Sequence, residues 1–152
     1  MMRLFVAVWP SEEAIAAIER LERPEHPAVR WTTRDQWHVT LRFHGEVPEE
    51  GIPDLVDDLH AVVAPPRSVT LGPATCRVRR SVLVVPVSGL DDLTDHAHLT
   101  LARSRGKRSL PRDLVGRCLA ATWLVDEVHL VRSHLEPSGA RYETIATAPL
   151  TG

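Results

Sequence analysis

The sequence predicts an α+β fold made of two similar lobes rather than one doubly wound parallel sheet. Apolar segments typical of strands alternate with two segments of helical periodicity, and the links between them are short. The tetrapeptide His-x-Thr-Leu occurs twice, at residues 38–41 and 98–101, and each copy lies in a predicted strand. One such strand in each lobe would let the two motifs face each other across a groove.

The first half of the chain predicts a strand, a helix, two strands and a second helix. Pro10 closes the first apolar run, and Ser11 is a suitable cap for the helix that follows, whose acidic first turn suits the helix dipole. Pro24 and Pro27 end this helix, and Pro65 ends the second one. The expected elements are strands at residues 3–9, 29–32 and 38–44 and helices at residues 11–21 and 48–64.

The second half of the chain is mostly β in character. Arg79-Arg80-Ser81 indicates the turn of a hairpin, and Glu-Pro-Ser-Gly at residues 136–139 indicates the turn between the last two strands. Pro111 suits the first position of a short helix. The expected elements are strands at residues 69–78, 82–87, 97–102, 123–135 and 141–148 and a helix at residues 111–120.

Composition narrows the class of protein. A chain of 152 residues with 43% hydrophobic residues can bury one ordinary core, so we expect one compact domain over residues 1–152. No apolar stretch approaches the ~20 residues needed to cross a bilayer, and the N-terminus leads into a strand without a cleavage site. This predicts a soluble, cytoplasmic protein without a membrane partner. Cys76 and Cys118 are expected to be reduced structural thiols.

Charge is distributed unevenly along the chain. The net charge of −2 excludes a generally basic nucleic-acid binder. Acids crowd residues 46–58, whereas a group of cations follows the second motif. These cations are Arg103, Arg105, Lys107, Arg108 and Arg112. Any contact with nucleic acid is therefore expected to be local. The alternative interpretation of these cations is a solvated basic loop without a binding role.

The repeated motif predicts acid–base chemistry. Side chains alternate along a strand, so His38 and Thr40 share one face, as do His98 and Thr100. An imidazole has a reference pKa of about 6.5, so one ring can be held neutral as a base and another protonated as an acid. A lone His-x-Thr is more often an ordinary polar strand face, and the duplication favours the catalytic interpretation.

A metal site is the alternative use of the histidines, because His96 and His98 would share one face of a strand. No cysteine pair, His-Glu-x-x-His helix or carboxylate cluster accompanies them. The sequence also contains no P-loop and no Gly-x-Gly-x-x-Gly motif. We therefore expect neither a metal nor a cofactor.

Four blocks spread over nearly the whole chain resemble the two-histidine phosphoesterase superfamily, specifically the bacterial RNA 2′,3′-cyclic phosphodiesterases, also called 2′-5′ RNA ligases. The blocks are RLFVAV at residues 3–8, Trp31 through HVTLRFHGEV ending at 47, HLTLAR at 98–103, and Ser133 through GARYE ending at 143. One departure is that family members usually have a helix and a loop before the second motif, where this chain has only residues 88–97.

The resemblance implies two pseudo-symmetric α+β lobes, with largely antiparallel sheets lining a central cleft and helices outside. It implies a substrate RNA ending in a 2′,3′-cyclic phosphate, which is opened to a 2′-phosphate without a metal. Similar proteins in some cases also join RNA ends reversibly through a 2′-5′ linkage. We accordingly expect a monomeric hydrolase of RNA processing.

Ring opening needs a deprotonated water and a protonated leaving oxygen. We expect His98 to activate the water as general base and His38 to protonate the departing 3′-oxygen of the ribose, although the two labels can be exchanged. Thr40 and Thr100 would hydrogen-bond the nonbridging phosphate oxygens. Arg103, at the end of the second motif strand, would bind phosphate through a charge-assisted bond.

Aromatic residues are scarce, and Phe43 and Tyr142 are the expected stacking partners for a terminal base because of the positions that the resemblance assigns them. Core packing is the alternative for both. Arg42 takes the approximate place after the first motif that Arg103 takes after the second, and a solvated or structural ion pair is at least as good an interpretation for it.

Two other functions stay open. One is a non-catalytic module that binds RNA ends and uses its histidines only as phosphate donors. The other is a phosphodiesterase for a small substrate, such as a cyclic nucleotide, a 2′-5′ oligonucleotide or an ADP-ribose cyclic phosphate.

Overall fold

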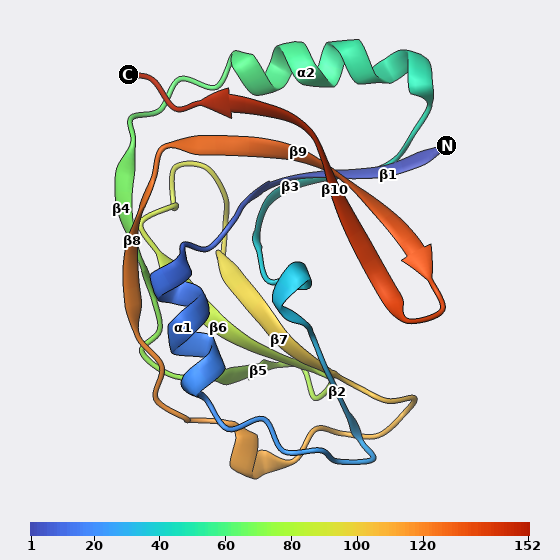
Figure 1. The fold of residues 1–152 in the computed structure, drawn as a ribbon, viewed down its shortest axis with the longest axis vertical. Coiled ribbons are helices and arrows are strands. Elements are labelled where there is room, and N and C mark those ends of the chain that lie inside the picture. The colour runs from blue at the N-terminus through green and yellow to red at the C-terminus, as the bar shows by residue number, and fades with distance from the viewer.

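Ten strands form one curled sheet in the computed structural model, which describes all residues 1–152 (Figure 1). The main path runs β10-β9-β1-β3-β7-β6-β4-β8, with β2 paired to β7 and β5 paired to β6, and every pair is antiparallel. The strands are β1 (Met2–Val8), β2 (Val29–Trp31), β3 (Val39–Val47), β4 (Arg67–Leu71), β5 (Cys76–Val78), β6 (Val82–Ser88), β7 (His98–Ser104), β8 (Ala121–Val125), β9 (Glu127–Glu136) and β10 (Gly139–Pro149).

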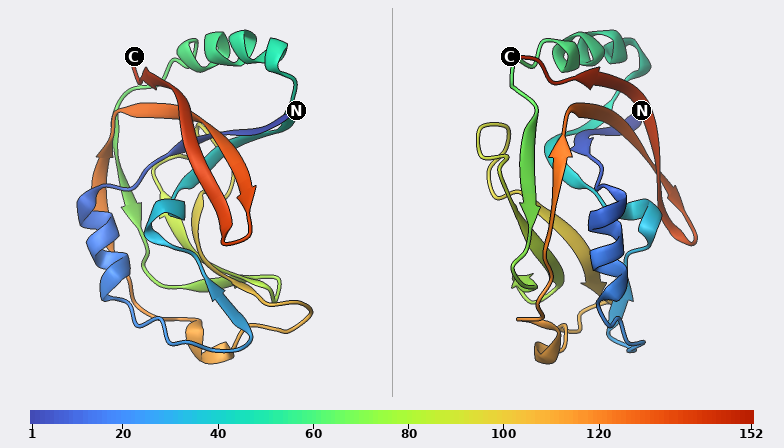
Figure 2. Two further views of the ribbon diagram at one scale, coloured as in Figure 1. Left: turned by 45° about the vertical axis from the view of Figure 1, so that its right-hand side comes forward. Right: turned by 60° about the vertical axis from the view of Figure 1, so that its left-hand side comes forward.

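Two α-helices flank the sheet. Helix α1 (Glu12–Arg20) contacts β8, and α2 (Ile52–His60) contacts β9 and β10. The two views in Figure 2 show α2 above the sheet and α1 along its side. Short 3₁₀ turns lie at η1 (Arg34–Gln36), η2 (Glu49–Gly51) and η3 (Arg112–Leu114). The expectation of largely antiparallel strands is confirmed, and the structure adds that they form one curled sheet with few helices. No helix combines the length and apolar character that crossing a membrane requires.

The two motif strands are neighbours in the middle of the sheet. Val39 of β3 pairs with Leu99 of β7, and four strands of the main path lie on each side of this junction. The sheet separates two apolar clusters, and β1 alternates between them. Leu4 and Val8 belong to the main core, whereas Phe5 and Ala7 belong to a small cluster with Val131.

Helix α1 forms as the sequence predicts. The Ser11 hydroxyl accepts a hydrogen bond from the Ala14 backbone N–H at 3.2 Å, which caps the first turn. Ala14, Ala17 and Ile18 are buried, so the predicted apolar face is the one that packs against the sheet. The second predicted helix is shorter than expected, because only residues 52–60 are α-helical and a 3₁₀ turn precedes them.

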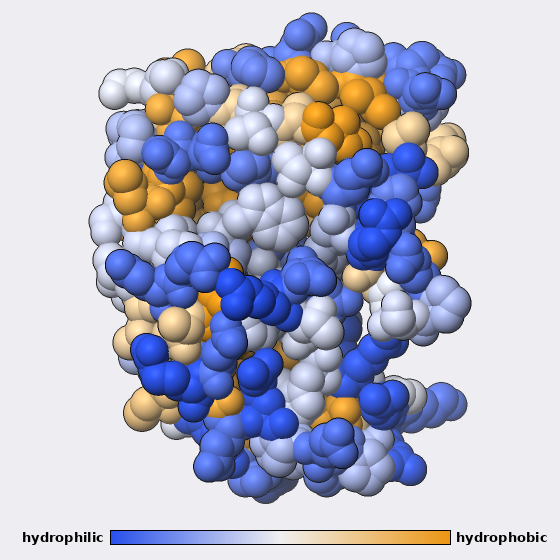
Figure 3. Space-filling model, viewed as in Figure 1, coloured by the Kyte–Doolittle hydropathy of each residue, from blue (hydrophilic) through white to orange (hydrophobic).

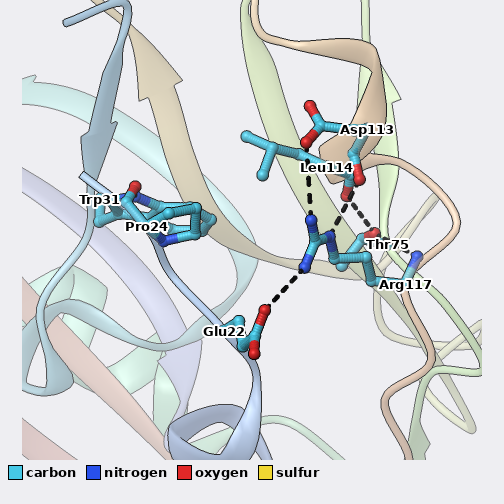
Figure 4. Close-up of polar contacts among 7 residues, drawn as sticks. All are labelled: Glu22, Pro24, Trp31, Thr75, Asp113, Leu114 and Arg117. Carbon is cyan, nitrogen blue, oxygen red and sulfur yellow. Dashed lines mark hydrogen bonds and ion pairs between the residues drawn. The ribbon is translucent and has the colours of Figure 1, made fainter. Parts of the chain in front are cut away.

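The helix predicted at residues 111–120 is wrong, because only the 3₁₀ turn η3 forms there. The rest of this stretch bonds to the segment between β4 and β5. The buried Thr75 hydroxyl donates to the Leu114 carbonyl at 2.6 Å and accepts from the Arg117 backbone N–H at 3.0 Å. Figure 4 shows Arg117 reaching from this loop to Glu22 and Asp113. These long-range contacts outweigh the weak local preference for a helix.

Two predicted strands are each divided in the structure. Residues 69–78 form β4 and β5, and residues 123–135 lie in β8 and β9, which separate at Asp126. Strand β8 pairs with β4, whereas β9 pairs with β1 and β10 at the other end of the main path. The buried positions change parity at this point, from Trp123 and Val125 to Val128 and Leu130. A single strand could not bury both sets on one face.

The segment before the second motif contains no helix. Residues 89–97 form an ordered loop in which Leu90 is fully buried and the Leu90 carbonyl accepts backbone hydrogen bonds from Leu93 and Thr94. The corresponding connection in the first half carries α1 between β1 and β2. The connection before β7 is therefore a loop, whereas α1 lies between β1 and the first motif strand β3.

Candidate active site

Both His-x-Thr motifs line one cleft with a volume of about 550 Å³. All seven residues predicted for the site are among its lining residues. They are His38, Thr40, Phe43, His98, Thr100, Arg103 and Tyr142. The tertiary structure therefore brings together side chains that come from three strands, β3, β7 and β10, and from the residue just before β3.

The His38 ring is held at both nitrogens. Nδ1 lies 2.7 Å from the Gln36 carbonyl oxygen, and Nε2 lies 3.0 Å from the Thr40 hydroxyl. A carbonyl oxygen can only accept, so Nδ1 carries the hydrogen. In the neutral ring, Nε2 then carries no hydrogen and accepts a hydrogen bond from the Thr40 hydroxyl. This arrangement leaves Nε2 as the nitrogen that can exchange a proton with a bound substrate.

His98 is oriented in the same way. Its Nδ1 lies 2.7 Å from the carbonyl oxygen of His96, two residues earlier, just as His38 bonds the carbonyl of Gln36. His98 is exposed to the cleft, and its Nε2 has no hydrogen-bond partner within the protein. Both rings therefore have the same tautomer imposed by the backbone and the same nitrogen available to substrate.

Burial lowers the pKa of His38 below its usual value. The hydrogen bond to Gln36 raises the pKa, whereas the positive charges of Arg103 and His98 lower it further. Aromatic rings supply much of the apolar surrounding: Phe5 and Tyr142 have ring centroids 4.9 Å and 5.0 Å from that of His38. His38 is therefore neutral in the free cleft near pH 7.

A bulge follows each motif at the equivalent leucine. Leu41 has no partner in β1, because Val6 pairs with Arg42 and Ala7 pairs with Thr40. Leu101 has no partner in β6, because Leu83 pairs with Ala102 and Val84 pairs with Thr100. A bulge shifts the alternation of side chains along the strand.

The bulges decide which residue after each motif faces the cleft. Phe43 and Arg103, each five residues after the motif histidine, both line it. Arg42 is exposed and lies outside the cleft, which agrees with the solvated alternative for this residue. Phe43 holds the equivalent position, which strict alternation along the strand could not predict.

The two predicted stacking residues have different surroundings. Phe43 is 56% exposed, and the Arg3 guanidinium lies 5.0 Å from its ring centroid. Tyr142 is partly buried and packs edge-on against Phe5 at 5.3 Å and against His38. Burial raises the pKa of the Tyr142 phenol. Phe43 thus presents an open ring, whereas Tyr142 is packed against the His38 imidazole.

Sequence reasoning missed the residues that hold the hairpin of β9 and β10 beside the cleft. Arg30 Nη2 donates to the Ser138 carbonyl at 2.9 Å, and Gln36 Nε2 donates to the Ala140 carbonyl at 2.8 Å. A Cβ on Gly139 would come within 2.6 Å of the Arg30 side chain, so the turn and this side chain are in close contact. Gln36 lies two residues before His38, just as His96 lies two residues before His98. This repeated spacing was visible in the sequence and could have indicated Gln36 as a residue of the site.

The His96–His98 metal alternative does not fit the geometry. His96 precedes β7 and has a positive φ of 52°, so the two histidines are not alternate residues of one strand. No three or more His, Cys, Asp or Glu side chains lie close enough together to hold a metal ion. The two imidazoles, two hydroxyls and guanidinium at the cleft form instead a set that can exchange protons with, and donate hydrogen bonds to, an anionic group.

Comparison with known proteins identifies the family. Residues 8–75 match the LigT-like phosphoesterase family. The chain is 30% identical to the RNA 2′,3′-cyclic phosphodiesterase of Thermus thermophilus over 185 residues, covering 99% of this chain and 91% of that protein. It therefore belongs to the LigT-like phosphoesterases.

Two further comparisons define the extent of the similarity. The chain is 29% identical over 180 residues to the RNA 2′,3′-cyclic phosphodiesterase of Geobacillus stearothermophilus, of which it spans only 57%. The crystal structure of a Thermus thermophilus protein superimposes with a TM-score of 0.84 at 28% identity, covering 99% of each chain. The fold, including both motif strands, is therefore shared over nearly the whole chain.

Proposed function

We propose that this protein hydrolyses the 2′,3′-cyclic phosphate at the end of an RNA strand and leaves a 2′-phosphate. The observation that carries the proposal is that two His-x-Thr motifs, from neighbouring strands, line one cleft, with each histidine Nδ1 held by a backbone carbonyl so that Nε2 is the nitrogen left for proton exchange. The relatives named RNA 2′,3′-cyclic phosphodiesterase support the choice of substrate. The two sides of the sheet, β10-β9-β1-β3 and β7-β6-β4-β8, would act as two pseudo-symmetric lobes of one domain.

The reaction needs one proton removed and one proton supplied. One imidazole Nε2 takes a proton from water, and the water oxygen attacks phosphorus. The bond between phosphorus and the 3′-oxygen breaks, and the other imidazole protonates that oxygen to give a 3′-hydroxyl and a 2′-phosphate. The same sequence of steps, with a 5′-hydroxyl in place of water as the attacking group, would form a 2′-5′ linkage and release the 3′-hydroxyl.

We assign the base to His38 and the acid to His98, which exchanges the labels first expected. Burial and the nearby positive charges keep His38 neutral in the free cleft, and a base must start without its proton. Thr40 and Thr100 would donate hydrogen bonds to the nonbridging phosphate oxygens, and the Arg103 guanidinium would balance the charge that develops on them.

A sulfur-substituted substrate tests the assignment. A thiolate leaves without needing a proton, so replacing the bridging 3′-oxygen by sulfur removes the requirement for an acid. His98→Ala should then recover activity on the sulfur substrate relative to the oxygen substrate, whereas His38→Ala should not. Recovery by His38→Ala alone would restore the opposite assignment.

The activity itself is tested with RNA oligonucleotides that end in a cyclic phosphate, a 2′-phosphate or a 3′-phosphate, each with and without EDTA. Mass spectrometry and phosphatase sensitivity give the position of the product phosphate. We expect only the cyclic end to react, a 2′-phosphate product, and no effect of EDTA. Binding without turnover would indicate a non-catalytic module, and turnover of cyclic mononucleotides alone would indicate a small-molecule phosphodiesterase.

A further inference from the structure

The cations that follow β7 have no acidic partners. No Asp or Glu lies between Asp95 and Asp113, whereas that stretch contains five cations. The ion pairs formed by arginine involve only Arg34, Arg67, Arg117 and Arg141. The charges of Arg103, Lys107 and Arg108 are therefore exposed and uncompensated. A solvated loop needs no such concentration of one sign next to a cleft.

Backbone contacts join three segments into one cationic surface beside the cleft. Arg30 of β2 pairs in register with Arg103 of β7. The backbone N–H of Ser104 bonds the Ser81 carbonyl, and that of Leu110 bonds the Arg80 carbonyl, which brings in the turn between β5 and β6. These segments lie together at the lower right of Figure 1 and in the left view of Figure 2. We call this surface the basic ridge; it consists of Arg30, Arg80, Arg103, Lys107 and Arg108.

The side of the cleft formed by β3 and the β9–β10 hairpin carries two exposed apolar side chains, beside the polar residues Arg3, Ser133 and Glu136. Phe43 is 56% exposed and Leu135, near the tip of the β9–β10 hairpin, is 82% exposed, and both line the cleft. Figure 3 shows the notch between the hairpin and the hydrophilic surface below it, at the right of the view. A single-stranded nucleic acid is flexible and exposes phosphates along one edge and bases along the other. The basic ridge suits the phosphates, and the exposed side chains of Phe43 and Leu135 suit the bases.

The ridge lies within reach of the reacting end. Arg103 lines the cleft, and Lys107 lies four positions further along the chain, a span of at most about 14 Å. Phosphates one to a few nucleotides before the cyclic end would therefore meet Lys107 and Arg108. The acids that crowd residues 46–58 lie on the segment that includes α2, at the other end of the molecule (Figure 1). This separation of negative and positive charge on the molecule would direct a polyanion toward the basic ridge.

We propose that the basic ridge binds the phosphates that precede the cyclic end, so that the preferred substrate is an RNA strand of several nucleotides rather than a free cyclic mononucleotide. This inference rests on the proposed hydrolysis at the same cleft. Beyond Arg103, which the proposed hydrolysis already assigns to the reacting phosphate, it adds ridge residues that select substrates by length and not by sequence.

The test compares Lys107→Gln/Arg108→Gln with Arg20→Gln/Arg42→Gln. Both double variants remove two exposed cations that lack acidic partners, but Arg20 and Arg42 lie outside the cleft and the ridge. Each protein is assayed on a ten-nucleotide RNA ending in a 2′,3′-cyclic phosphate and on a 2′,3′-cyclic mononucleotide, over a range of salt concentrations. The mononucleotide has no upstream phosphate, so it reports the chemistry alone.

The ridge variant should raise KM for the oligonucleotide at least about fivefold and leave kcat and the mononucleotide reaction unchanged. The slope of log kcat/KM against log salt should become shallower by about 1.4 for the two lost contacts. The control variant should behave like the parent protein. Equal effects on both substrates, or no effect on either, would contradict the proposal that the basic ridge binds upstream phosphates. Failure of the parent protein to open either substrate would instead refute the hydrolysis.

Discussion

Val39 of β3 pairs with Leu99 of β7, and this is the register point at which the two motif strands meet. Because the strands are antiparallel, the motifs run in opposite directions on either side of the pair. His38 therefore lies on the same side of this point as Thr100, and Thr40 on the same side as His98. Each imidazole is thus placed near a hydroxyl of the other motif, and a phosphate between the strands would contact both motifs at once.

Replacing either motif histidine should abolish most of the activity. Loss of a general acid or base costs roughly 10²- to 10⁴-fold, so we expect His38→Ala and His98→Ala each to lower kcat at least about a hundredfold. Substrate binding should change much less, as measured by fluorescence polarisation with a labelled RNA. His60→Ala, on α2 and away from the cleft, is the matched control. Activity of either motif variant within threefold of the parent would contradict the mechanism.

The hydroxyls of Thr40 and Thr100 should contribute to kcat separately from the two imidazoles. Thr40→Val and Thr100→Val keep the shape of the strand but remove the proposed donor to a phosphate oxygen and, at position 40, the hydrogen bond to His38 Nε2. Loss of such a donor costs on the order of 10²-fold in kcat in comparable sites. Thr40→Ser and Thr100→Ser keep the donor and should stay within about tenfold of the parent. Steady-state kinetics distinguish the two sets. If the serine variants lose as much as the valine variants, the methyl group and not the hydroxyl is what the site needs.

Gln36 acts as a positioning residue. Its backbone carbonyl fixes the tautomer of His38, and its side chain bonds the Ala140 carbonyl of β10. We expect Gln36→Ala to lower kcat/KM about tenfold and to speed hydrogen exchange in residues 138–142, because the hairpin loses one attachment near the cleft. Arg34→Ala is the control, since Arg34 lies on the same 3₁₀ turn but pairs with Glu12 and Glu19. Equal changes in both variants would indicate a general loosening of η1.

Stability should fall as the pH drops below the usual histidine pKa. Burial is the main cause of the lowered pKa values of His38, His44 and His129. Between those lowered values and about 6.5, the unfolded chain binds more protons than the folded one. The free energy of unfolding therefore increases with pH across this window and reaches its full value above it.

Urea unfolding at pH 7.5 and pH 5.5 measures this effect. The parent protein should be less stable at pH 5.5, and His38→Gln should show a smaller difference between the two pH values. His60→Gln should keep the parent difference, because His60 is exposed on α2. An unchanged difference in His38→Gln would show that His38 contributes nothing to the pH dependence.

Thr75 should stabilise the loop that replaces the expected helix. Thr75→Val removes the donor to the Leu114 carbonyl and leaves the Arg117 backbone N–H without its acceptor. A buried group left unpaired costs about 1–3 kcal/mol, so urea unfolding should show a loss of that size. Thr70→Val, whose hydroxyl is exposed, is the control. Turnover at saturating substrate should be unaffected in both, because neither residue lines the cleft.

Local sequence patterns correctly predicted the elements whose capping, apolar face or turn is specified by residues close together in the chain. The cap at Ser11, the apolar face of α1 and the two hairpin turns formed where the sequence indicates them. The helix at residues 111–120 failed because Gly116 adopts a positive φ of 83°, and the backbone of Gly116 and Arg117 bonds Thr75 instead of continuing the 3₁₀ turn. The break at Asp126 was visible as a change in the parity of apolar positions, but a run rich in Val and Leu masked it.

By itself, the sequence determined a mainly β chain with a capped helix after the first strand and two hairpin turns. It also determined the placement of each imidazole beside a hydroxyl two residues away, because the period of a strand places alternate side chains on one face. Only the tertiary structure decided that β3 and β7 are neighbours, that bulges at Leu41 and Leu101 turn Phe43 and Arg103 into the cleft, and that burial lowers the pKa of His38. These features depend on contacts between residues far apart in the chain, which no local period encodes.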